Sequence, residues 1–146
     1  MADEIDPVSP DEFVLRKVPD RPSYYDPSLP QPVSRLAFAP TERDTDGISL
    51  FRSVFTTPEM VSALSKPKGC WITQLIAQAF FDFDLTIKPD PLRPGWPRGH
   101  SLVPELNWAA RQQKEDKALR HRLKEIQVEL AKLAGHGVIY HSEPDE

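Results

Sequence analysis

Five large aliphatic residues near the end of the chain repeat at the spacing of an α-helix. They are Leu119, Leu123, Ile126, Leu130 and Leu133. The intervals of four, three, four and three residues place all five on one face, because a helix turns once every 3.6 residues. A helix is therefore expected over about 105–134, with Asn107 or Pro104 at its start and Gly135 closing it in a left-handed conformation.

This apolar seam has to be covered, since burying a side chain of this size contributes about 1.5–3 kcal/mol. In one interpretation the helix covers the chain's own sheet. In the other it pairs with a second helix, from another copy or from a different protein. The seam is narrow, and the run 111–117 that precedes it contains no apolar residue. We therefore expect a protein–protein interaction or accessory module. It binds a protein partner, or a second copy of itself in an oligomer, through these five residues.

The distribution of proline indicates which regions of the chain are loops. The chain has 16 prolines in 146 residues, about twice the usual ~5% share. Eight lie in the first forty residues and five lie between Pro89 and Pro104. Proline has no backbone N–H to donate, so these regions are expected to be proline-rich loops rather than central strands.

Alternating or β-branched segments predict the strands. They are expected at 13–18, 33–39, 48–55, 71–73, 83–88, 100–103 and 138–140, with short helices from Pro58 and up to Phe81. The fold class is α+β, a small mixed or antiparallel sheet with short helices and one long C-terminal amphipathic helix. We expect one domain over 13–142, a disordered acidic segment over 1–12 and an acidic tail over 143–146.

Composition excludes several classes of function. The net charge is −4, so general nucleic-acid binding is not expected, although 105–134 carries seven basic and five acidic residues. The single Cys70 cannot form an intrachain disulfide, and the four histidines lack the spacing of metal ligands, so no metal and no cofactor is expected. No run approaches about 18 apolar residues, and the N-terminus is acidic. The expectation is a cytoplasmic, bacterial protein that does not contact membranes.

A ligand pocket is the alternative function. Arginines and a serine on expected strands, together with a loop that carries Trp, Arg and His, are the parts of such a pocket. They are Arg16, Arg35, Ser49, Arg52, Trp96, Arg98 and His100. Because guanidinium groups bind phosphate bidentately, they suggest a small nucleotide- or NAD-related enzyme or sensor, for instance one that transfers ADP-ribose.

Two observations favour a role without catalysis. Exposed arginines commonly pair with surface acids and then carry no information about a ligand. The sequence also contains no G-x-S-x-G, no glycine-rich phosphate loop and no H-E-x-x-H motif. The catalytic residues of an enzyme are therefore not identified from the sequence, and the interaction module is the preferred interpretation.

Overall fold

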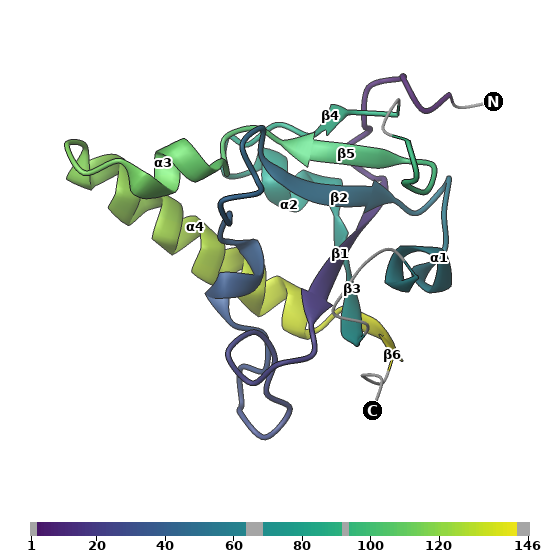
Figure 1. Ribbon diagram of the computed structural model, residues 1–146, viewed down its shortest axis with the longest axis horizontal. Helices are drawn as coiled ribbons and strands as arrows, with labels where there is room; N and C mark the ends of the chain where they lie inside the picture. Colours follow the sequence, from purple (N-terminus) through teal and green to yellow (C-terminus); the bar gives the residue numbers. More distant parts are fainter. Residues whose placement is uncertain (1–2, 64–68, 92–93, 143–146) are drawn as a thin grey trace.

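Six strands form one sheet in the order β4-β5-β2-β1-β3-β6, and every neighbouring pair is antiparallel (Figure 1). The computed structural model describes residues 3–63, 69–91 and 94–142. The strands are β1 (Phe13–Pro19), β2 (Ile48–Arg52), β3 (Cys70–Ile76), β4 (Lys88–Pro89), β5 (His100–Val103) and β6 (Val138–Ser142). The expected α+β class with a small sheet is confirmed, and the sheet is antiparallel.

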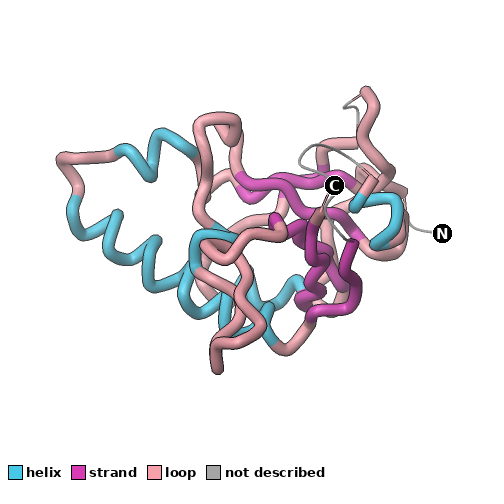
Figure 2. The backbone as a smooth tube through the Cα atoms, turned by 60° about the horizontal axis from the view of Figure 1, so that its bottom comes forward, coloured by secondary structure: helices cyan, strands magenta, loops and turns pink. Residues whose placement is uncertain are grey.

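In the described ranges, four α-helices and one 3-10 helix accompany the sheet. They are η1 (Arg35–Phe38), α1 (Pro58–Ser62), α2 (Ala77–Phe81), α3 (Trp108–Gln112) and α4 (Lys117–Gly135). Figure 2 shows α4 along one side of the molecule, with the strands gathered on the other side. Thr57 caps α1 by accepting a hydrogen bond from the backbone N–H of Met60, and the helix begins at the expected Pro58.

The helix expected over 105–134 is two helices. Asn107 caps α3, which ends at Gln112, and Asp116 begins α4 by accepting a hydrogen bond from the backbone N–H of Leu119 at 2.9 Å. The break falls within the polar run 111–117, where no apolar side chain holds a helix against the core. Gly135 is the last residue of α4, and its backbone is not left-handed, so that part of the expectation is wrong.

The seam of α4 packs mainly against its own chain. Leu123, Ile126 and Leu130 are buried in the main core, together with residues of η1 and β1. Leu119 and Leu133, at the two ends of the seam, are 36% and 48% exposed. Three of the five residues expected to bind a partner are therefore part of the internal core.

Residues 3–12, expected to be disordered, pack against the sheet. The reason is Arg52 on β2, whose side chain is only 2% exposed. Its guanidinium donates to the Glu12 carboxylate and to the backbone oxygens of Glu4 and Asp6, at 3.1 and 2.8 Å. A buried charge requires such acceptors, and the N-terminal segment supplies them. The tail 143–146 lies outside the described residues.

Two expected strands do not form as predicted in the described residues. Residues 35–38 form η1, because the Ser34 hydroxyl accepts a hydrogen bond from the backbone N–H of Leu36 and starts a helical turn. Residues 83–87 of the alternating run 83–88 form a turn and a loop, with Asp84 at a φ of 61°, and only Lys88 enters a strand, β4. Leu85 and Ile87 are buried by packing rather than by strand pairing.

Strands β1 and β2 separate along their length, and this separation creates the candidate site. They pair at Val14 with Arg52 and at Leu15 with Phe51, whereas β1 and β3 pair at seven positions. Beyond Leu15 the Arg16 side chain lies between the two strands. Figure 1 shows β1 crossing away from β2 toward the lower end of the molecule.

Candidate functional site

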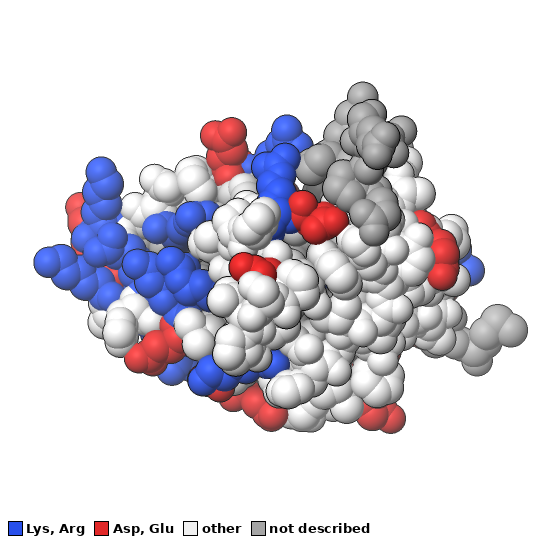
Figure 3. Space-filling model, turned by 90° about the horizontal axis from the view of Figure 1, so that it is seen from below, with Lys and Arg blue, Asp and Glu red and all other residues white. Residues whose placement is uncertain are grey.

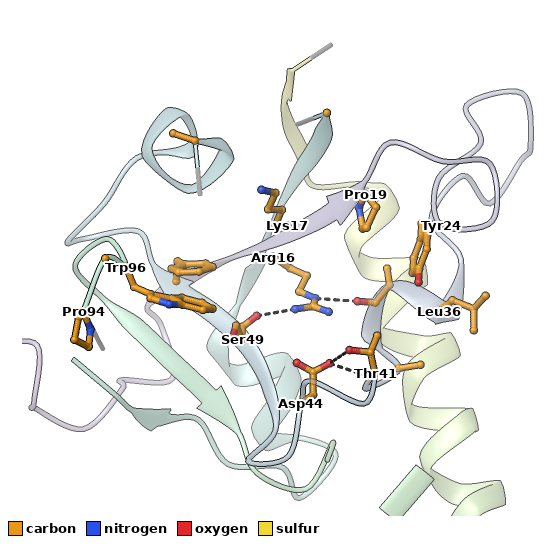
Figure 4. Close-up of a pocket in the computed structure, with 16 residues that line it drawn as sticks. Arg16, Lys17, Pro19, Tyr24, Leu36, Thr41, Asp44, Ser49, Pro94 and Trp96 are labelled. Atoms are coloured by element: carbon orange, nitrogen blue, oxygen red, sulfur yellow. Dashed lines mark hydrogen bonds between the residues drawn. The ribbon is translucent and has the colours of Figure 1, made fainter. Parts of the chain in front are cut away.

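A cavity of about 590 Å³ lies where β1 and β2 separate (Figure 4). Its volume is within the range of about 300–1,000 Å³ that is usual for small-molecule sites. The walls come from β1, β2, η1, the proline-rich arm and the loop before β5. The polar and aromatic lining residues are Arg16, Lys17, Tyr24, Thr41, Asp44, Ser49, Phe51 and Trp96.

The Arg16 side chain donates hydrogen bonds in the gap between β1 and β2, where the two strands are not paired. Its Nε donates to the backbone oxygen of Ala37 at 2.8 Å, and its Nη1 donates to the backbone oxygen of Ser49 at 2.9 Å. Within the described residues, Nη2 has no acceptor. Burial lowers the pKa of Arg16 from its ordinary value, while Asp44 and Tyr24 act in the opposite direction. A guanidinium remains charged at neutral pH, so a fixed cation lies in the wall of the cavity.

Aromatic side chains form one end of the cavity. Trp96 stacks on Phe51, with ring centroids 5.9 Å apart and planes at 19°. Trp96 is 38% exposed and follows Gly95, whose φ of 80° turns the loop. Figure 4 shows Tyr24 at the opposite end of the cavity, with Arg16 between the two aromatic residues. The site thus combines a central cation with aromatic rings at both ends.

A hydrogen-bonded line of side chains lies beside this aromatic end. The Nδ1 atom of the buried His100 is 3.1 Å from Asp90 Oδ2 and 3.2 Å from the Asp90 backbone oxygen. Two acceptors at Nδ1 fix the proton there, so Nε2 accepts a hydrogen bond from the Ser49 hydroxyl at 2.9 Å. Hydroxyl, imidazole and carboxylate follow one another in the order found in serine nucleophile systems. This line orients Ser49 and gives its proton an acceptor.

The structure brings together four of the seven pocket residues expected from the sequence. Arg16, Ser49 and Trp96 line the cavity, and His100 contacts Ser49 and Trp96.

The other three expected pocket residues lie elsewhere, which corrects the expectation. Arg35 donates to the Gln127 side chain at 3.3 Å, and Arg98 pairs with Glu4 at 3.3 Å. Arg52 is held by Glu12. Arg35 and Arg52 were placed in the pocket from residue type and expected strand position, and Arg98 from its place in the proline-rich loop. None of these indicates which acceptors a long side chain reaches.

Sequence reasoning missed Lys17, Tyr24, Asp44 and Asp90. Lys17 follows Arg16 on the same strand, where successive side chains point to opposite faces, so the strand pattern gave no reason to place both residues in one pocket. Tyr24 lies in a proline-rich arm, and Asp90 lies in a proline-rich loop. Their approach to the sheet depends on the tertiary path of those loops and has no periodic signature.

The part of the chain that the structure describes contains no cluster of three His, Cys, Asp or Glu side chains able to hold a metal ion. No helix in the described ranges has the length and apolarity needed to cross a membrane. Comparison with family models, with curated proteins and with solved structures finds no match to this chain. The functional argument therefore depends on the geometry of the site.

Proposed function

We propose that the cavity between β1 and β2 binds a nucleotide-class ligand. The phosphate group would accept hydrogen bonds from Arg16, and the planar base would contact Trp96. The observation that carries this proposal is the geometry of the Arg16 guanidinium, which is fixed by two backbone oxygens and keeps an unused Nη2 group. A donor held in place before binding loses little conformational freedom when a ligand arrives.

The charge of the cavity favours an anion. Arg16 and Lys17 contribute two positive charges to the lining, against one negative charge from Asp44. The Asp44 carboxylate already accepts hydrogen bonds from the backbone and hydroxyl of Thr41, at 2.7 and 3.1 Å. Charges in a partly buried site interact more strongly than charges in bulk water, so the fixed Arg16 guanidinium supports phosphate binding.

The aromatic residues favour a ligand with a planar ring. Stacking on an aromatic side chain is worth about 1–3 kcal/mol per base in proteins that bind nucleic-acid bases. Trp96 lies on a loop and stays partly exposed beside its contacts with Phe51 and His100, so a ligand ring can contact it without displacement of a core residue. A small inorganic anion alone would leave this end of the cavity unused.

Calorimetry with NAD, ADP-ribose and ATP tests the proposal. At least one ligand should bind, and Arg16→Lys should weaken binding about tenfold because lysine cannot reproduce the fork of donors. Trp96→Ala should weaken binding by a similar factor while leaving the circular dichroism spectrum unchanged. Arg122→Lys is the matched control, since Arg122 is exposed on α4 and lies away from this cavity. Flat traces for all three ligands with a folded wild-type sample would refute the proposal.

Partner binding through α4 is the second candidate. It is favoured by the exposure of Leu119 and Leu133 at the ends of the seam and of Val128 on the same helix. Light scattering should then report a dimer or larger assembly, and Leu119→Lys combined with Leu133→Lys should yield a folded monomer. A wild-type chain that is monomeric at high concentration would exclude self-association.

A further inference from the structure

A second cavity, of about 180 Å³, lies between η1, α3 and α4. Four cationic side chains from three different elements converge on it. They are Arg35 of η1, Arg111 of α3, and Arg120 and Lys124 of α4. Figure 3 shows Lys and Arg side chains gathered at this end of the molecule, although the whole chain has a net charge of −4. The local excess of positive charge is therefore a property of this site.

These four cations have no carboxylate partner among the described residues. Two of them donate to neutral acceptors: Arg35 to the Gln127 side chain at 3.3 Å, and Arg111 to the backbone oxygen of Pro40 at 2.7 Å. Two other cations of α4 do have carboxylate partners. Arg122 lies 3.3 Å from Asp84, and Lys132 lies 3.1 Å from Glu129.

Arg120 provides a second, independent observation. Its Nε atom is buried and has no hydrogen-bond partner among the described residues. A buried donor without an acceptor costs free energy, and such groups in folded proteins are rare. Around one small cavity, four cations without a carboxylate partner in the described ranges also repel one another. An anion bound in the cavity would relieve both penalties at once.

We propose that this cavity binds a phosphoryl oxyanion, such as phosphate or pyrophosphate. Guanidinium groups and an ammonium group supply the charge-assisted hydrogen bonds that such an anion accepts on several sides. The volume is smaller than the ~300 Å³ lower bound for drug-sized ligands, so the cavity accommodates a phosphoryl group without an attached nucleoside.

The site is separate from the nucleotide-class cavity. The two cavities share no lining residue, and η1 lies between them: Arg35 faces the small cavity, whereas Leu36 and Ala37 face the large one. The anion site therefore does not depend on the proposed nucleotide function, and each proposal is tested with its own variants.

The test is an NMR titration of the full-length protein with sodium pyrophosphate and, separately, with inorganic phosphate at constant ionic strength. Saturable shifts are expected for the arginine Nε–Hε signals of Arg120 and Arg35, accompanied by a rise in Tm. Arg120→Gln and Lys124→Gln should each weaken pyrophosphate binding about 10- to 100-fold, which is the range for losing a hydrogen bond to a charged group.

Arg122→Gln and Lys132→Gln are the matched controls, because both residues lie on α4 and already have carboxylate partners. Each control should change pyrophosphate affinity less than about twofold. No saturable shift at the wild-type Nε–Hε signals with either anion would overturn the proposal, whether or not the variants fold. Binding of a single-stranded oligonucleotide without binding of pyrophosphate would also overturn it, and would indicate a nucleic-acid surface instead.

Discussion

The Arg52 guanidinium binds both carboxylate oxygens of Glu12, with Nε 2.6 Å from Oε1 and Nη2 3.0 Å from Oε2. This pair joins the N-terminal segment to β2, where Arg52 has almost no contact with solvent. Removing one partner of a buried pair leaves an uncompensated charge. We therefore expect Glu12→Ala to lower the free energy of unfolding by about 3–5 kcal/mol, measured by urea denaturation.

The control for this prediction is Glu129→Ala, which removes one partner of an exposed pair on α4. Glu129 lies 3.1 Å from Lys132, and both side chains are about half exposed. Exposed pairs of this kind contribute less than about 1 kcal/mol. Equal losses for the two variants would show that the N-terminal segment is held by something other than Glu12.

The seam of α4 gives the second prediction. Leu130 is fully buried and Leu133 is about half exposed, although both lie on the same expected apolar face. Leu130→Ala should lower the free energy of unfolding by about 2–5 kcal/mol, because the lost contacts and the resulting cavity add. Leu133→Ala should change it by less than about 0.5 kcal/mol. A large loss for Leu133→Ala in a monomeric sample would contradict the packing described for this helix.

The sequence predicted the elements that depend on local chemistry. The spacing of the seam predicted α4, Pro58 predicted the start of α1, and Asn107, expected to begin one long helix, begins α3. Local chemistry could not determine how far the two ends of the seam are buried. The pattern treats Leu119 and Leu133 as equal to Leu130, but their burial depends on how far η1 and the sheet extend beneath the helix.

The remaining failures have a common physical cause, which is that distant segments supply the acceptors and the cover. Arg52 was assigned to a pocket because strand alternation does not indicate a distant ion-pair partner. That partner is Glu12, forty residues earlier in the chain. The run 83–88 alternates perfectly, yet Asp84 takes a left-handed turn, and Leu85 and Ile87 are buried before the chain enters β4 at Lys88. Arg16 and Ser49 lie together because β1 and β2 are neighbouring antiparallel strands, paired at Val14–Arg52 and Leu15–Phe51.

Two glycines at the end of α4 give a prediction about backbone packing. A Cβ atom on Gly137 would lie 2.2 Å from the backbone oxygen of Gln74, where β6 approaches β3. Gly137→Ala should therefore force these strands apart and lower the free energy of unfolding by about 2–3 kcal/mol. Gly135 is the neighbouring control: its nearest contact would be Pro32 at 3.5 Å, so Gly135→Ala should be neutral or stabilising. Thermal and urea denaturation of both variants measure the difference, and similar stabilities would contradict the close approach.

Lys17 gives a prediction about pH, because burial lowers its pKa from the ordinary value of 10.5 and Cys70 acts in the opposite direction. As pH rises through this lowered pKa, Lys17 loses its charge before an exposed lysine does. The affinity for ADP-ribose, if it binds in the large cavity, should therefore fall as pH rises in the alkaline range below 10.5, the ordinary pKa of lysine. Stability without ligand should change in the opposite sense: the unfolded state binds more protons in this window, so the free energy of unfolding gains a contribution that rises with pH. Lys17→Arg keeps its charge throughout, and both trends should be weaker in that variant. Calorimetry and urea denaturation over this pH range measure the two trends, and identical slopes for wild type and Lys17→Arg would show that another group titrates.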